Sequence, residues 1–125
     1  MATWTQDELS RIENADELEL APLRSDDTPG ESTTVWVVRD GDDLLVRAFH
    51  GRGGTWFRAA TAQHAGHIRS GGVDKDVTFV EETDPALNDR LDAAYHGKYG
   101  RYSDTYVRPI VADTARAATL RLVPR

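Results

Sequence analysis

Alternating apolar and polar positions run through much of the chain and predict strands joined by tight turns. Six segments have this alternation or the β-branched and aromatic composition typical of strands. They span residues 17–23, 33–39, 44–50, 65–69, 76–81 and 117–123. Because turn residues separate several successive segments, we expect antiparallel hairpins that form a small barrel or curled sheet with helices packed outside.

The hairpin formed by residues 33–39 and 44–50 has the strongest local pattern. Asp40, Gly41, Asp42 and Asp43 between the two strands are typical of a turn. If all four residues form the loop, one face pairs Trp36 with Arg47, Val38 with Leu45 and Thr34 with Phe49, and the other pairs Val37 with Val46 and Val35 with Ala48. A two-residue turn at Asp40 and Gly41 would shift these partners.

Helical patterns occupy the remaining stretches. Thr5 followed by Glu8 is the sequence of a capping box, which predicts a helix running to about residue 14. Asp84 as N-cap, with Pro85 at the first helical position, predicts the longest helix, which ends at Gly100.

Two further segments are less regular. Residues 102–115 favour helical turns interrupted before Pro109, and residues 55–60 form a short element of undefined type. The pattern therefore predicts one α+β, mainly β, domain over residues 1–125, with six antiparallel strands and two or three flanking helices.

The distribution of charge is the most unusual feature of the sequence. Of the 21 Asp and Glu residues, none falls between Leu44 and Gly72, a window of 29 residues that holds four Arg and three His. The whole chain has a net charge of −6. A basic window in an acidic protein favours a local site for a small phosphorylated molecule, because nucleic-acid binding requires a broader cationic surface.

Composition excludes several classes of protein. The chain has no Cys, which removes disulfides, thiolate metal sites and cysteine nucleophiles. No window approaches the roughly 20 apolar residues of a membrane span, and residues 1–20 lack the pattern of a secretory signal. We therefore expect a cytoplasmic protein with neither a membrane nor a nucleic acid as partner.

The candidate anion site combines basic and glycine residues of the acid-free window. Its members are Arg47, Arg52, Arg58, Gly53 and Gly54. Arg47 lies in an otherwise apolar strand, where an unpaired charge is costly, so it needs an anion or a stacking partner such as Trp36. Arg52 is placed to close over a phosphate held by the glycine amides, and a solvated loop arginine is the alternative.

Aromatic and histidine residues supply the remaining candidates. Trp36 and Trp56 are suited to stack on a planar cofactor ring, although filling the barrel core is the alternative. His64 and His67 are three residues apart on a predicted strand and so point to opposite faces, which argues against a metal site. His50 is a potential acid or base, but the spacing identifies no catalytic partner and the catalytic residues stay unknown.

Several motifs along the chain resemble a bacterial family of unknown function, domain of unknown function 2255. These are Val35-Trp36-Val37-Val38, Gly41-Asp42-Asp43-Leu44, Gly54-Thr55-Trp56-Phe57-Arg58-Ala59, Asp92-Ala93-Ala94-Tyr95 and Thr119-Leu120-Arg121-Leu122. That family is similar to the FMN-binding split-barrel proteins, which include deazaflavin-dependent nitroreductases. The resemblance implies a six-stranded split barrel, often a homodimer, that holds FMN or deazaflavin by its phosphate.

Two functions follow from the resemblance. The first is a flavin- or deazaflavin-dependent oxidoreductase, in which the arginines hold phosphate and Trp36 or Trp56 packs against the ring. The second is a non-catalytic ligand-binding or dimerisation module of the same fold without a cofactor. The second is favoured by the acidic segment Asp26-Asp27-Thr28-Pro29-Gly30, which stands where nitroreductase relatives carry glycine and basic residues.

Overall fold

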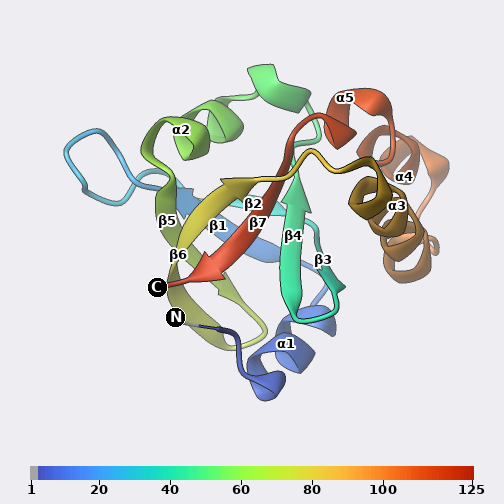
Figure 1. Cartoon of the computed structure of the whole chain (residues 1–125), viewed down its shortest axis with the longest axis horizontal. Coiled ribbons are helices and arrows are strands. Elements are labelled where there is room, and N and C mark those ends of the chain that lie inside the picture. The colour runs from blue at the N-terminus through green and yellow to red at the C-terminus, as the bar shows by residue number, and fades with distance from the viewer. Residues whose placement is uncertain (1–2) are drawn as a thin grey trace.

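The computed structural model describes residues 3–125, apart from the side chain of Asp104. Runs of strands are separated by helices along the chain (Figure 1). In order they are α1 (Gln6–Glu13), β1 (Leu18–Pro22), β2 (Thr33–Val35), β3 (Val37–Asp40), β4 (Asp43–Arg47), the 3₁₀ turn η1 (Gly51–Gly53), α2 (Thr55–Gln63), β5 (Ala65–Ser70), β6 (Val73–Glu81), α3 (Pro85–Tyr99), α4 (Asp104–Ile110), α5 (Asp113–Arg116) and β7 (Thr119–Pro124).

The seven strands form one antiparallel sheet in the order β2-β1-β5-β6-β7-β4-β3. The two edge strands, β2 and β3, are separated in the chain by Trp36 alone. The sheet therefore curls until its edges meet, which gives a nearly closed barrel (Figure 1). This confirms the predicted fold class.

Residues 3–125 form seven strands rather than six because the predicted strand 33–39 divides at Trp36. Its first half pairs with β1, with Leu18 opposite Val35, and its second half pairs with β4, with Val37 opposite Val46. The hairpin partners predicted for Val37 and Val38 are correct. The partners predicted for Thr34, Val35 and Trp36 are wrong, because the chain turns from β4 to β1 at this point.

Residues 3–125 form five α-helices where two or three were expected. The undefined segment after Gly54 is α2, which buries Phe57 and Ala60 three positions apart on one face. Residues 102–115 divide into α4 and α5, and the break follows Pro109 instead of preceding it. Near the end of α4, the missing amide of proline removes only one helical hydrogen bond.

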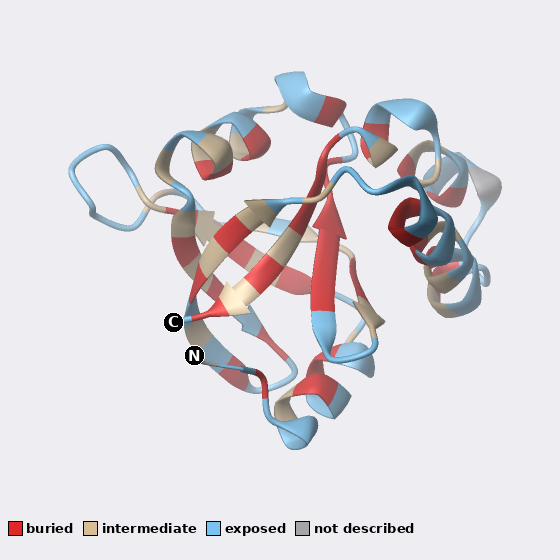
Figure 2. Cartoon of the chain, viewed as in Figure 1, coloured by how far each residue is buried: buried red, intermediate tan, exposed pale blue. Residues whose placement is uncertain are grey.

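Two buried clusters hold the molecule together. One fills the barrel, where Leu9 and Ile12 of α1 and Phe57 of α2 pack onto strand residues from opposite ends (Figures 1 and 2). The other joins the outside of β3 and β4 to α3, α4 and α5, with Tyr95 and Tyr99 at its centre. None of the helices within residues 3–125 is both long and apolar enough to cross a lipid bilayer.

Candidate functional site

A cleft lies between β2 and the residues that follow the end of β4. It consists of two cavities, of about 340 Å³ and about 580 Å³, which share Thr33, His50 and Trp56 in their walls. We call the smaller one the Trp36 cavity and the larger one the Gly54 cavity. Their volumes are in the range of small-molecule sites.

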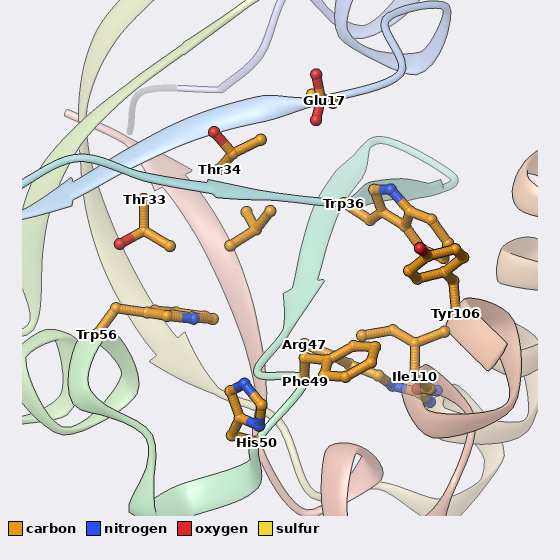
Figure 3. Close-up of a pocket in the computed structure, with 11 residues that line it drawn as sticks. Glu17, Thr33, Thr34, Trp36, Arg47, Phe49, His50, Trp56, Tyr106 and Ile110 are labelled. Atoms are coloured by element: carbon orange, nitrogen blue, oxygen red, sulfur yellow. The ribbon is translucent and has the colours of Figure 1, made fainter.

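The Trp36 cavity is largely aromatic. Figure 3 shows the Trp56 indole entering from α2, with Trp36 and Tyr106 across from it and Phe49 below. The other residues that line it are Glu17, Thr33, Thr34, Val35, Arg47, His50 and Ile110. The cavity is therefore lined by segments that are far apart in sequence, from Glu17 to Ile110.

Trp36 is held rigidly in this wall. Its indole stacks on the Tyr99 ring, with centroids 4.0 Å apart and planes 5° from parallel. The Tyr99 hydroxyl accepts a hydrogen bond from the Val37 amide at 3.1 Å and donates to the Asp16 carbonyl at 2.7 Å. Burial raises the pKa of Tyr99, so its hydroxyl stays protonated and able to donate. One face of Trp36 is thereby covered by protein.

Arg47 lies at the bottom of the Trp36 cavity, but its guanidinium points away into the second core. It donates to Asp92 at 2.5 Å, to the Ile110 carbonyl at 3.0 Å and to Asn88 at 2.9 and 3.0 Å. It also lies 5.3 Å from the centre of the Tyr95 ring. The anion that the buried Arg47 needs is therefore Asp92 and not a ligand. Its aromatic stacking partner is Tyr95 and not Trp36.

Arg52 and Arg58 lie outside both cavities. Arg52 is paired with Glu81 at 2.7 Å and donates to the Ala117 carbonyl at 3.0 Å. Arg58 is exposed on α2. The structure therefore does not bring the three predicted arginines together. The window is free of acids only along the sequence, because Asp92 and Glu81 fold onto it from later elements.

The Gly54 cavity contains the start of α2. Gly54, the N-cap, supplies no side-chain cap, and the first turn has no acidic residue. The cavity wall adds the Thr55 side chain, Arg24 and Glu31, whereas Gly53 lies outside it. Free amides at a helix start, a hydroxyl and a guanidinium are a donor set that fits a phosphate group.

Other polar groups near the cleft have structural partners. Lys98 donates to the Val37 carbonyl at 2.8 Å, and burial lowers its pKa to about 8. Among residues 3–125 no cluster of three or more His, Asp or Glu is placed to bind an ion. Phe49, Tyr106 and Glu17 were missed as site residues. Phe49 is exposed at a strand end, but no local pattern connects it with Tyr106, some sixty positions later.

Comparison with solved structures shows the same fold. A "Putative Pyridoxamine 5'-phosphate oxidase" from Listeria innocua superposes with a TM-score of 0.66 at 13% identity, over 94% of this chain and 90% of that chain. A conserved hypothetical protein from Mycobacterium tuberculosis gives a TM-score of 0.64 at 16% identity, over 98% and 81%. An "F420 Reductase" gives 0.56 at 19%, over 93% and 90%.

At these sequence identities the similarity shows the fold and nothing further. The fold of this chain is a split barrel. A comparison with functionally curated proteins found no match. Residues 8–122 match a bacterial family, which confirms the resemblance of the motifs. The chain belongs to the family described as "Uncharacterized protein conserved in bacteria (DUF2255)".

Proposed function

We propose that the cleft binds a flavin-type cofactor, FMN or deazaflavin, and that the protein is a flavin-dependent oxidoreductase. The observation that carries the proposal is the pair of adjoining cavities at the opening of the barrel. One has donors suited to phosphate, and both are bounded by the Trp56 indole. Structures with this fold include proteins described as a "Putative Pyridoxamine 5'-phosphate oxidase" and an "F420 Reductase", which supports a ring-and-phosphate ligand.

The residues present divide the work of binding. The α2 amides, the Thr55 side chain and Arg24 would hold the phosphate in the Gly54 cavity, and Trp56 would pack against the ring. The His50 imidazole lies in the wall common to both cavities, where its ring nitrogens are able to form a hydrogen bond to a bound ligand. A bound flavin supplies the hydride chemistry, and the protein supplies position and electrostatics.

Titration of the purified protein with FMN, riboflavin and deazaflavin tests the proposal. We expect FMN or deazaflavin to quench tryptophan fluorescence at micromolar concentrations. Replacing Thr55→Glu should weaken FMN binding about tenfold or more and riboflavin binding much less, because riboflavin has no phosphate to repel. The new carboxylate lies in the first turn of α2, where it favours the helix, so the fold is preserved.

A matched pair of tryptophan variants locates the ring. Trp56→Ala should abolish most of the affinity, whereas Trp4→Phe should leave it unchanged, because Trp4 is buried outside both cavities with its indole nitrogen donating to the Leu122 carbonyl. Absence of binding by FMN and deazaflavin alike at 100 µM would reject the proposal.

A homodimer is part of the same proposal, carried by the resemblance to the split-barrel proteins. Size-exclusion chromatography coupled to light scattering should then give a mass of about twice 13.9 kDa. A monomeric mass at micromolar concentration would contradict it.

A non-catalytic ligand-binding module is the second candidate function. It is favoured by the engagement of Arg47 and Arg52 with Asp92 and Glu81, which leaves Arg24 as the guanidinium in the Gly54 cavity. A folded protein that binds neither FMN nor deazaflavin would favour this candidate over the oxidoreductase.

A further inference from the structure

The cofactor assignment leaves most of the Trp36 cavity unexplained. Trp36, Phe49 and Tyr106 present aromatic surface there, and none of the three belongs to the wall of the Gly54 cavity. Phe49 is 41% exposed and Tyr106 57% exposed. Large aromatic groups displayed together around a cavity mark a binding surface rather than a core.

The charge of this cavity is negative. The one arginine in its wall, Arg47, pairs with Asp92, which also pairs with Arg116, and Arg116 in turn pairs with Asp89. Two cations and two anions therefore cancel beneath the cavity. Glu17 remains, an exposed carboxylate at the rim with no ion pair among residues 3–125.

Figure 3 shows Glu17 across the cavity from Phe49 and Ile110, with the ring of Trp36 to one side. Aromatic faces carry the negative end of the ring quadrupole and attract cations, most strongly for Trp. A carboxylate at the rim adds to this attraction and repels anions. An uncharged ligand would gain only from burial of its apolar surface.

We infer that the Trp36 cavity is a second subsite of the cleft and binds a small organic cation, such as an alkylated ammonium group, beside the cofactor. The inference rests on the proposed function in that it gives the Gly54 cavity to the cofactor. Because the two cavities share Trp56, Thr33 and His50, a ligand in one lies against a ligand in the other. The Trp36 cavity thus has the position of a substrate site.

Choline and its uncharged counterpart 3,3-dimethyl-1-butanol, which have the same shape, test the inference. Titration of the full chain, followed by tryptophan fluorescence and by NMR line broadening of the ligand, should show choline binding at least fivefold more tightly. Glu17→Gln should reduce that preference about three- to tenfold. Glu31→Gln is the matched control, since this carboxylate lines only the Gly54 cavity, and it should leave the preference unchanged.

The outcomes separate this inference from the proposed function. Equal affinity for choline and the alcohol, no choline binding at 50 mM, or an equal effect of both glutamate variants would overturn the inference. Saturating FMN should leave choline binding intact, and direct competition between the two ligands would also overturn it. Failure of every flavin to bind, with choline preference preserved, would instead reject only the cofactor.

Discussion

Arg47 illustrates how a single buried charge determines local structure. Its side chain is 0% exposed, and its guanidinium connects β4 to Asn88 and Asp92 of α3 and to the end of α4 at Ile110. Removal of one member of a buried ion pair costs about 3–5 kcal/mol, because the remaining charge keeps its desolvation penalty. Helix α4 forms part of the wall of the Trp36 cavity, and Arg47 holds the end of this helix through the Ile110 carbonyl. The position of that wall therefore depends on Arg47.

We predict that Arg47→Ala lowers the free energy of unfolding by about 3–5 kcal/mol. Arg47→Lys should also destabilise the protein, since one ammonium group cannot reach Asn88, Asp92 and Ile110 together. Urea unfolding measures both. Arg52→Ala is the control, with an expected cost below about 1 kcal/mol, because its ion pair with Glu81 is half exposed. Similar costs at Arg47 and Arg52 would show that burial of Arg47 is not what makes it important.

His67 makes stability depend on pH. Its ring lies between Asp76, whose carboxylate is 2.8 Å from Nδ1, and Asp74 on the neighbouring strand. The hydrogen bond to Asp76, followed by that to Asp74, raises the pKa of His67 above its usual 6.5. The stabilisation is therefore complete below about pH 6.5, the pKa of an unfolded histidine, and is lost as pH rises through the higher folded pKa.

We accordingly expect the His67→Gln variant to have a lower free energy of unfolding than the wild-type protein at pH 6. This deficit should be smaller at pH 9. The midpoint of urea unfolding, measured at intervals between these values, follows the difference. A difference that is constant across this range would mean that the charge of His67 contributes nothing to folding.

At the scale of elements, the closure of the barrel depends on α3. The Tyr99 ring supports Trp36, and its hydroxyl occupies the Val37 amide at the first residue of β3. The side chain of Lys98 binds the Val37 carbonyl from the same helix end. Because β2 and β3 part from each other at Trp36, the backbone there lacks a continuous strand partner, and helix side chains take its place.

Tyr99→Phe should therefore destabilise the protein by about 1–3 kcal/mol, since the buried Val37 amide loses its acceptor. The variant should also weaken ligand binding in the Trp36 cavity, because Trp36 is less firmly positioned. Tyr102→Phe is the control and should change stability by less than about 0.5 kcal/mol, as this hydroxyl is exposed. Chemical unfolding and choline titration of both variants provide the comparison.

What the sequence predicts correctly is local. Thr5 and Glu8 form both hydrogen bonds of the predicted capping box, and Asp84 caps α3 by accepting from the Leu87 amide. The pairing of Val37 with Val46 follows from alternation around the turn. Each of these depends on residues within about ten positions, where spacing alone determines which groups meet.

What the sequence could not predict is the long-range neighbour of each charge. Asp92 lies 45 residues from Arg47, and Glu81 lies 29 residues from Arg52. Their pairing removes the convergence of arginines expected from the acid-free window. Trp36 and Trp56, the two aromatic residues predicted for the site, both line the Trp36 cavity. Trp36 reaches it from the break between β2 and β3, and Trp56 reaches it from the first turn of α2.

At the scale of the whole molecule, the barrel joins the two ends of the chain. Strand β7, the last in sequence, lies between β6 and β4, and the Trp4 indole donates to the Leu122 carbonyl at 2.9 Å. Trp4 and the last strand therefore lie together, and the loop of residues 24–30 projects from the barrel at the left of Figure 1. A barrel with this arrangement should not need its natural order of segments, because adjacent ends are readily joined.

We predict that a circular permutant of residues 1–125, with its ends joined by a short Gly-Ser linker and opened between Asp26 and Asp27, folds to the same barrel. Both residues are exposed, and Asp27 has a positive φ of 65° that opening the loop relieves. The permutant should keep the near-ultraviolet circular dichroism of its tryptophans and lose roughly 1–2 kcal/mol of stability, the entropy of an altered loop.

A second permutant, opened between Gly71 and Gly72, should lose distinctly more. This turn joins β5 to β6, the most extensive strand pair, and a side chain at Gly71 would meet the Arg11 carbonyl at 2.3 Å, so the turn packs closely on α1. If both permutants were equally stable, the β5–β6 turn would not guide closure of the barrel. If the one opened at Asp26 failed to fold, the proximity of the chain ends would not be enough, and loop 24–30 would have to be a required part of the fold.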